Sequence, residues 1–327
     1  MLSNTQSLVG FAFVLAIIIV DGLILVEEQG DSETMVWVDG GTFTMGSDRG
    51  LQDEAPARPV EISGFWIDKY EVTNSQFKQF VDATAYATGA ERFGDSMVFQ
   101  SPIARSLSEL VPLSWWQLVE EADWRHPEGP EDTIVARMNH PVVQVNYEDA
   151  LSYCNWQGKT LPTEAQFEFA ARGGREGQVY SWGDQPIHRE QAVTNHWQGT
   201  FPIKNENTDG HAGSAPVGSF PANDFGLYDI TGNVWEWVSD WYHPNAYAIL
   251  KDRNPIGVTR LESFDPSEPN LPKRGIRGGS FLCSENYCQG FRVSARMPAD
   301  PESATNHTGF RCVIPNRSNR LDAIWLN

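Results

Sequence analysis

The stretch from about residue 180 to residue 275 constrains the fold more than any other feature. It is dense in Gly, Pro, Asn, Asp and Trp and has little hydrophobic periodicity, so it predicts long irregular segments. Irregular segments of this length are uncommon in compact domains unless a function or a bound ligand orders them. The stretch is therefore a first indication that the chain holds metal ions.

Charge and absent motifs exclude several functions. The sequence has 24 Lys and Arg residues against 43 Asp and Glu residues, for a formal net charge of −19. This charge repels phosphate backbones and anionic lipids, so we expect no nucleic-acid partner. The chain also lacks the G-x-G-x-x-G and G-x-S-x-G motifs of dinucleotide-binding proteins and hydrolases. The acidic surplus instead suits bound cations or a basic ligand.

An apolar segment near the start predicts export. Leu8 to Val20 is a run of 13 apolar residues, and Leu23 to Val26 follows. A membrane span needs about 20 apolar residues, so we interpret residues 1–34 as a signal peptide or, alternatively, a signal anchor. A buried N-terminal helix is the third interpretation. Export places the protein in the secretory pathway (the ER lumen or outside the cell) or in the periplasm, and limits membrane contact to this anchor.

The rest of the chain reads as one domain. From residue 36 onward there is no internal repeat, low-complexity tract or linker, so we expect a domain over residues 35–315 and a tail over 316–327. Capping signals predict three helices within it. They are Thr73 with Gln76, Asn146 ahead of a face formed by Tyr147, Ala150, Leu151 and Cys154, and Thr163 with Gln166. Strands are predicted at 36–38, 42–45 and 60–67, with Asp39-Gly40-Gly41 joining the first two as a hairpin.

The four cysteines leave several pairings open. Cys154, Cys283, Cys288 and Cys312 allow three complete pairings, and no zinc-site spacing of Cys and His is present. Cys283 and Cys288 lie five positions apart and could form either a disulfide or a two-thiolate site for a soft ion such as copper(I). Spacing alone favours the disulfide.

Two oxygen-rich segments are candidate calcium loops. Residues 205–210 (N-E-N-T-D-G) imitate the first half of an EF-hand loop, but its twelfth position is Pro216 instead of Glu. An Asx-rich turn without metal explains this segment equally well. In residues 229–236 (D-I-T-G-N-V-W-E), Gly232 would let the backbone curl around a cation, which by itself is only suggestive.

Seven stretches together carry a specific resemblance. They are G-G-T-F-T-M-G-S (40–47), D-K-Y-E-V-T-N (68–74), W-R-H-P-E-G-P (124–130), L-P-T-E-A-Q-F-E-F (161–169), G-L-Y-D-I-T-G-N-V-W-E-W (226–237), R-G-G-S-F-L-C (277–283) and G-F-R-C (309–312). In this order they resemble the formylglycine-generating enzymes, which oxidise a cysteine of a nascent sulfatase to Cα-formylglycine. The resemblance implies a single irregular α+β fold of the C-type-lectin-like kind, with little regular secondary structure and stabilised by calcium.

The resemblance assigns the catalytic residues. Cys283 and Cys288, within G-G-S-x-x-C-x-x-x-x-C, distinguish the active oxidases and are implied to be catalytic ligands of copper(I). A copper ion held by two thiolates leaves room for the substrate thiolate and can activate O2. Ser280 and Trp235 match residues beside the metal and oxygen pocket; a turn hydroxyl and a core indole are their ordinary alternatives.

Two calcium sites are also implied. The first consists of Asn195, Asp209 and the carbonyl groups of His196 and His211, and the second of Asp229, Glu236 and the carbonyl groups of Gly232 and Val234. The family uses Asn at the position of Asp229. Bound calcium would give the irregular 180–275 region a reason to be ordered.

The implied partners are sulfatase polypeptides that present an unfolded C-x-P-x-R segment. Asp95 matches the carboxylate that pairs with the arginine of this motif, and a solvated loop acid is the alternative. Arg296, His307 and Tyr287 match residues of the substrate groove.

The two remaining cysteines, Cys154 and Cys312, match a family disulfide that ties an early helix to the last strand. A second disulfide found in some members is absent here, because Ala171 and Val293 occupy its positions. The alternative function is a non-catalytic protein of the same fold that holds a peptide or a sugar in the groove.

Overall fold

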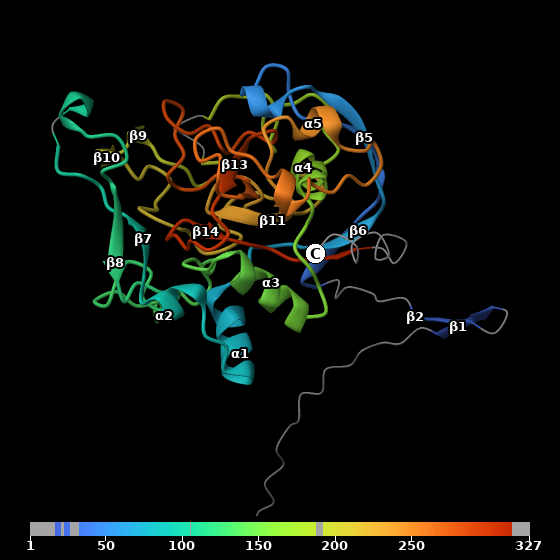
Figure 1. Ribbon diagram of the computed structural model, residues 1–327, viewed down its shortest axis with the longest axis horizontal. Coiled ribbons are helices and arrows are strands. Elements are labelled where there is room, and N and C mark those ends of the chain that lie inside the picture. Colours follow the sequence, from blue (N-terminus) through green and yellow to red (C-terminus); the bar gives the residue numbers. More distant parts are fainter. Residues whose placement is uncertain (1–16, 21–22, 27–32, 105, 188–191, 316–327) are drawn as a thin grey trace, which may run out of the picture.

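The structure is a computed structural model that describes residues 17–20, 23–26, 33–104, 106–187 and 192–315 (Figure 1). Most of the expected leader (1–34) and all of the expected tail (316–327) lie outside these ranges. In the part of the leader that is described, β1 (Ile17–Val20) pairs with β2 (Leu23–Val26). No helix in the described ranges is long and apolar enough to cross a membrane.

The helices begin where the capping signals predict. In α1 and α4 the side chains of Thr73 and Thr163 accept hydrogen bonds from the third helical N–H, and Asn146 does the same for α3. These bonds satisfy backbone donors that have no partner inside the helix. The helices are α1 (Asn74–Thr84), α2 (Gly89–Phe93), α3 (Tyr147–Trp156), α4 (Glu164–Arg172) and α5 (Ala246–Ile249), with 3-10 turns η1 (Gln52–Glu54), η2 (Leu107–Glu109) and η3 (Arg260–Glu262).

The strands form small separate sheets. The central sheet has the order β13-β12-β11-β14, in which only β11 and β14 run parallel, and a second sheet has the order β15-β6-β3. Two-stranded pairs β4-β5, β7-β8 and β9-β10 complete the described domain. The strands are β3 (Met35–Val38), β4 (Gly41–Met45), β5 (Arg58–Ile62), β6 (Phe65–Asp68), β7 (Asp95–Phe99), β8 (Trp116–Glu120), β9 (Gly199–Thr200), β10 (Lys204–Asn205), β11 (Trp235–Trp241), β12 (Arg274–Arg277), β13 (Arg296–Ala299), β14 (Thr308–Gly309) and β15 (Val313–Pro315).

The predicted hairpin between residues 36–38 and 42–45 is wrong. The two strands exist, but β3 pairs with β6 and β4 pairs with β5. A Cβ on Gly40 would collide with the Ile62 carbonyl, so this glycine permits a close approach of two chain segments rather than a tight turn. The single strand predicted over 60–67 is interrupted at Ser63 and Gly64 and becomes β5 and β6.

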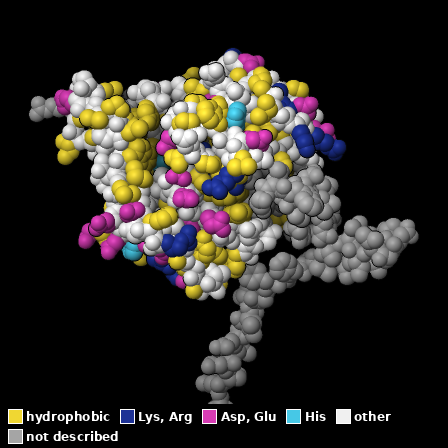
Figure 2. All heavy atoms as spheres, viewed as in Figure 1, with side chains coloured by type: hydrophobic (Ala, Val, Ile, Leu, Met, Phe, Trp, Pro, Cys, Tyr) yellow, Lys and Arg dark blue, Asp and Glu magenta, His cyan; other side chains and the backbone are white. Residues whose placement is uncertain are grey.

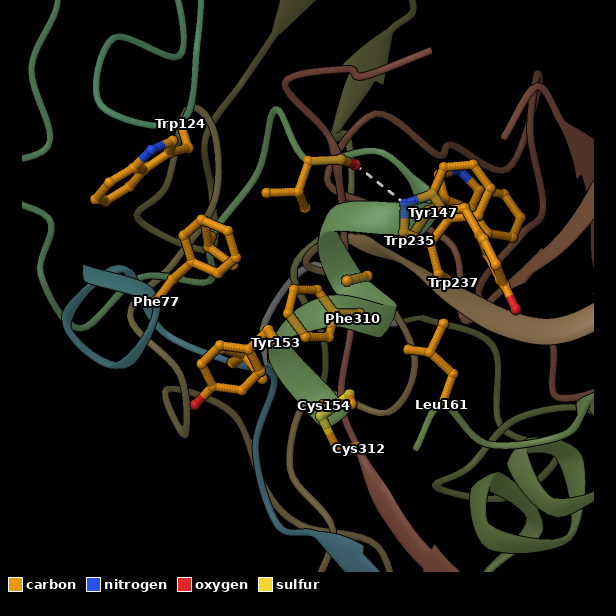
Figure 3. Close-up of a cluster of buried hydrophobic side chains, with 14 of the residues drawn as sticks. Phe77, Trp124, Tyr147, Tyr153, Cys154, Leu161, Trp235, Trp237, Phe310 and Cys312 are labelled. Carbon is orange, nitrogen blue, oxygen red and sulfur yellow. Dashed lines mark hydrogen bonds between the residues drawn. A yellow bond between two sulfur atoms is a disulfide. The ribbon is translucent and has the colours of Figure 1, made fainter. Parts of the chain in front are cut away.

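The hydrophobic core surrounds the central sheet. α1 packs on α3 on one side of β11 and β14, whereas α4 and α5 lie on the other side (Figure 1). The cluster that includes side chains of α1 and α3 contains Phe77, Tyr153, Trp237 and Phe310, and Figure 3 shows the sulfurs of Cys154 and Cys312 at its edge. Of the predicted core-facing positions of α3, Tyr147, Ala150 and Cys154 are buried, and Leu151 is partly buried against the same cluster.

The disulfide between Cys154 and Cys312 is confirmed. It joins α3 to the residue before β15, with a Cα–Cα distance of 5.7 Å and a sequence separation of 158 residues. Chain-entropy arguments assign such a long closed loop up to about 4–5 kcal/mol of stability, because the disulfide restricts the unfolded chain.

We therefore predict that the Cys154→Ser/Cys312→Ser double variant loses several kcal/mol of unfolding free energy, measured by urea denaturation. The Cys283→Ser/Cys288→Ser double variant is the matched control, because its loop spans only 5 residues and restricts the unfolded chain far less. Equal losses in the two variants would contradict the prediction.

Candidate active site and cation sites

A tight turn after β12 presents the first candidate cysteine. The chain leaves Arg277 through Gly278 and Gly279, both at positive φ, and a Cβ on Gly279 would lie 2.5 Å from the Gly290 carbonyl carbon. The Ser280 carbonyl accepts a hydrogen bond from the Cys283 N–H (2.9 Å), and Ser280 Oγ accepts one from the Leu282 N–H (3.2 Å). Ser280 is fully buried, so in this structure its hydroxyl shapes the turn.

The structure joins Cys283 to Cys288 as a disulfide. Their Cα atoms are 4.5 Å apart. Cys283 is 1% exposed, whereas Cys288 is half-buried, so the pair has one sheltered and one accessible member. A Cβ on Gly290 would lie 2.9 Å from the Cys283 sulfur and 2.5 Å from the indole ring of Trp235. Glycine at 290 therefore lets the loop close over Trp235 and Cys283.

The donor chemistry of this pair fits copper(I). Both sulfurs already occupy one small volume, and in their reduced form they are soft thiolate donors, which this ion favours. No group of three or more Cys, His, Asp or Glu side chains that could hold a metal is found in the described ranges. The two thiolates would hold a copper ion and leave positions open for a substrate thiolate.

Residues 278–295, between β12 and β13, form the cysteine loop, and an ion pair holds its C-terminal end in place. Arg292 donates to both carboxylate oxygens of Glu54 (2.5 and 2.6 Å), and Ser294 Oγ donates to the same carboxylate at 2.7 Å. Burial raises the pKa of Glu54, but Arg292 and the Leu51 N–H outweigh it and hold the pKa below its ordinary value. The charged Glu54 thus connects the loop after β4 to the cysteine loop.

A buried network supports the start of the loop. Arg277 donates to Glu168 (2.7 Å) and Glu164 (3.1 Å), two carboxylates of α4. All three side chains are at most 2% exposed. The charge of Glu164 is maintained against burial, because Arg296 and Arg277 hold its pKa below the ordinary value.

The structure places Arg296, which the resemblance assigns to the substrate groove, in a buried ion-pair network. The residue is 4% exposed, and its guanidinium group binds both oxygens of Glu164, at 2.6 and 2.7 Å. Its remaining nitrogen donates to the backbone carbonyls of Asp53 and His243. Arg296 therefore belongs to the network that supports β12, and four of its five N–H donors bind other residues of the protein.

An aromatic cluster flanks the accessible cysteine. Tyr287 is 52% exposed and stacks on Phe201 (4.3 Å between ring centroids), with Trp115 edge-on at 5.9 Å. Phe201 in turn stacks on Phe99 of β7. Ring contacts thus connect Tyr287, which precedes Cys288, to the β7-β8 ribbon. Asp95 lies half-buried at the start of β7.

His307 lies at the edge of the same cluster. Its ring contacts Trp116 (4.8 Å between centroids), and its Nδ1 lies 2.8 Å from the Thr305 hydroxyl. Burial lowers the pKa of His307 to about 3, so the imidazole is neutral at physiological pH. Its carbonyl accepts a hydrogen bond from the N–H of Trp235, which is 2% exposed.

The residues of the first predicted calcium site lie near one another. The His196 carbonyl and the Asp209 carboxylate both accept hydrogen bonds from the same amide nitrogen, Gln198 Nε2, at 2.5 Å. The His211 N–H donates to the other oxygen of Asp209 (2.9 Å). Asn195 is 1% exposed, and its Oδ1 has no hydrogen-bond partner. A buried acceptor without a donor is what a hard cation would satisfy.

The second predicted calcium site also contains a buried side-chain oxygen that has no hydrogen-bond partner. Asp229 is buried and its Oδ1 has no hydrogen-bond partner, while its Oδ2 accepts from the Gly218 N–H at 2.6 Å. Burial raises the pKa of Asp229 to about 6. Gly232 has φ +86°, and a Cβ there would collide with Thr194. Glu236 binds Arg311 through both oxygens, at 2.8 to 3.0 Å.

Sequence reasoning missed Glu71. It lies in the D-K-Y-E-V-T-N stretch, is 1% exposed, and accepts hydrogen bonds from Asn233 Nδ2 (2.6 Å) and the Val234 N–H (3.2 Å). Burial and the nearby carboxylates of Asp229 and Glu236 raise its pKa well above the ordinary value. Three carboxylic acids therefore face one guanidinium group, that of Arg311, in this part of the interior.

Comparisons with known proteins identify a family and several relatives. Residues 22–316 match the family model of the sulfatase-modifying factor enzyme 1-like domain. The chain is 46% identical over 292 residues to a formylglycine-generating enzyme of Thermomonospora curvata, covering 87% of this chain and 94% of that one. It is also 41% identical over 289 residues to a mouse protein named inactive C-alpha-formylglycine-generating enzyme 2, covering 85% and 84%.

A solved structure shares the fold. The structure of PvdO from Pseudomonas aeruginosa superposes with a TM-score of 0.61 at 24% identity, covering 86% of this chain and 94% of that chain. The predicted fold class, an irregular α+β domain with little regular secondary structure, is confirmed.

We predict that Glu164→Gln destabilises the protein by about 3–5 kcal/mol, because it removes a charge that two buried guanidinium groups share. Chemical denaturation measures the loss. Asp224→Asn is the matched control, since it breaks the solvent-exposed pair with Arg175 and should leave the unfolding midpoint unchanged. A Glu164→Gln protein as stable as the control would refute this account of the network.

Proposed function

Because the chain belongs to the sulfatase-modifying factor enzyme 1-like family, we propose that it activates sulfatases by generating formylglycine, with copper(I) and O2 as its means of oxidation. The substrate is the cysteine of a C-x-P-x-R segment in an unfolded sulfatase polypeptide. The Cys154–Cys312 disulfide supports an exported location, either the secretory pathway or the periplasm, because disulfides persist there.

The observation that carries this proposal is the paired sulfurs of Cys283 and Cys288. Overall identity does not separate active from inactive relatives, since a protein named inactive is 41% identical to this chain. The cysteine pair is specific to the oxidases by the resemblance, and here both sulfurs meet beside an accessible surface. Oxidation chemistry therefore fits the site better than simple binding.

The proposed reaction balances with one O2 and two reducing equivalents from an external thiol. The substrate group –CH2–SH becomes –CHO and releases hydrogen sulfide, which removes two electrons. Two molecules of thiol supply two more electrons and become a disulfide. The four electrons reduce O2, whose oxygen atoms are accounted for by the aldehyde and one water. Bound copper(I) would supply a soft site for the substrate thiolate and for O2 activation.

The chain's own residues would position the reactants. Cys288, the half-buried member of the pair, would be the one that an arriving peptide reaches, and Cys283 is sheltered by Trp235 and the close approach of Gly290. Tyr287 offers an exposed ring beside the cysteine. Asp95, at the start of β7, would take the arginine of the motif as an ion pair.

Incubation with a C-x-P-x-R peptide tests the proposal. With copper(I), O2 and a thiol reductant, we expect the peptide cysteine to become an aldehyde, measured by mass spectrometry. Cys283→Ser and Cys288→Ser should each abolish the conversion. Cys154→Ser/Cys312→Ser, which also removes two sulfurs, should keep it at temperatures where that variant is folded.

The alternative function is a protein that holds a peptide or sugar on this fold without oxidising it. It predicts an unchanged peptide mass, peptide binding that both single cysteine variants retain, and copper binding no tighter than that of the Cys283→Ser variant. This set of results would overturn the oxidase proposal.

Calcium at the two oxygen-rich sites is the second part of the proposal. It is supported by the partnerless oxygens of Asn195 and Asp229 and by the excess of buried carboxyl groups around Arg311. A ligand at a hundred times its Kd stabilises the folded state by about 2.7 kcal/mol, so calcium would contribute measurably to stability.

We therefore expect chelation with EDTA to lower the Tm and added calcium to restore it. Asp229→Ala should remove one equivalent of bound calcium, counted by metal analysis. Asp229→Asn should retain it, because the amide oxygen still coordinates and the family uses Asn there. A chelated protein with an unchanged Tm and no bound calcium would contradict this part of the proposal.

A further inference from the structure

The β7-β8 ribbon stands at one edge of the molecule (Figure 1). Side chains alternate across a strand, so Asp95, Met97 and Phe99 share a face. The opposite face carries Ser96 and Val98, which are 4% and 0% exposed and pack toward the body of the protein. On the face that bears Asp95, Asp95 and Met97 are therefore partly accessible, whereas Phe99 is buried beneath Phe201.

Three cross-strand residue pairs, here called rungs, lie on this face and differ in their chemistry. The ladder pairs Asp95 with Glu120, Met97 with Leu118, and Phe99 with Trp116. The face is thus acidic at one end, apolar in the middle and aromatic at the other end. In the space-filling view, hydrophobic side chains follow this part of the molecule and acidic side chains gather at its lower end (Figure 2).

The aromatic end leads to the cysteine pair. Phe99 stacks on Phe201 (5.7 Å between ring centroids), which stacks on Tyr287, the residue before Cys288. From Phe99 to Asp95 the strand advances four residues, or about 13 Å. An extended C-x-P-x-R peptide also advances four residues from its cysteine to its arginine. A peptide with its cysteine at the aromatic end therefore places its arginine at the acidic rung.

The acidic rung has a charge that the protein does not neutralise. Asp95 and Glu120 are directly opposed, a placement that brings their Cβ atoms within about 5 Å and that is unfavourable for like charges. Within the described ranges neither side chain makes an ion pair or a hydrogen bond. Glu120 is exposed and Asp95 half-buried, so both carboxylates are available to a ligand.

We propose that Glu120 is a specificity-determining residue that binds the substrate arginine together with Asp95. This inference rests on the proposed function, because it takes the C-x-P-x-R peptide as the occupant of the ribbon face. A guanidinium group has five N–H donors in a planar fork, enough to bind one carboxylate through two bonds and a second through another. The rung therefore selects a residue that can satisfy two carboxylates at once.

The test compares two neighbouring charge removals. Glu120→Gln removes the proposed contact, and Glu121→Gln removes the same charge one position further along the chain, on an exposed residue beyond the strand end. Each variant is measured with a C-x-P-x-R peptide and with the same peptide ending in Ala. Binding is measured separately with peptides in which Ser replaces the cysteine, so that this readout does not depend on oxidation.

With peptides that end in arginine, we expect Glu120→Gln to raise the KM of the cysteine peptide and the Kd of the serine peptide about three- to fivefold, with kcat unchanged. The alanine peptide should bind wild type and Glu120→Gln equally. Glu121→Gln should match wild type with both peptides. The difference should shrink at high salt, because the contact is between charges near the surface.

The outcomes separate this inference from the function on which it rests. If wild type converts the arginine peptide but Glu120→Gln behaves as Glu121→Gln does, the role of Glu120 is overturned and the oxidase stands. If wild type converts no peptide but Glu120→Gln selectively weakens binding of the arginine-containing serine peptide, the role of Glu120 stands and the oxidase does not. Absence of any arginine-dependent binding overturns the inference.

Discussion

The ion pairs of Arg277 with the carboxylates of α4 are the constraint on which the rest of the structure depends. Arg277 ends β12 and immediately precedes the glycine turn that carries Cys283. Three buried guanidinium groups, those of Arg172, Arg277 and Arg296, share the two carboxylates of α4, and removing one carboxylate leaves positive charge unpaired in the interior. The network therefore tolerates little movement, and it fixes α4, β12 and the base of the cysteine loop relative to one another.

Side-chain bonds to the backbone replace regular secondary structure over much of this fold. Glu54 accepts from Leu51 and Arg292, Asp229 accepts from Gly218, and Glu71 accepts from Val234. Buried backbone groups need partners whether or not they lie in a ladder or helix. Polar side chains in the interior supply them, which explains why a chain so rich in irregular segments is well ordered around its candidate sites.

Local signals were predictable from sequence, and long-range placement was not. The caps at Thr73, Asn146 and Thr163 depend on neighbours within three residues, so those helices were found. The pairing of β3 with β6 depends on the close approach that Gly40 permits to a distant carbonyl, which no local pattern reveals. Motif matching placed Cys283 and Cys288 together but could not show that Arg296 faces Glu164 instead of the groove, or that Glu71 joins the Asp229 region.

The Cys154–Cys312 disulfide makes the chain between these residues a covalent ring. Both candidate calcium sites and the cysteine pair lie inside the ring, whereas Asp95 and Glu120 lie outside it. A single proteolytic cut within the ring leaves both fragments attached, so a nicked protein keeps its candidate catalytic residues on one molecule. A cut between the ribbon and α3 has no such protection, and it would leave the ribbon held to the rest of the molecule by non-covalent contacts alone, among them the hydrogen bonds of Met97 and Phe99 to residues 304–306.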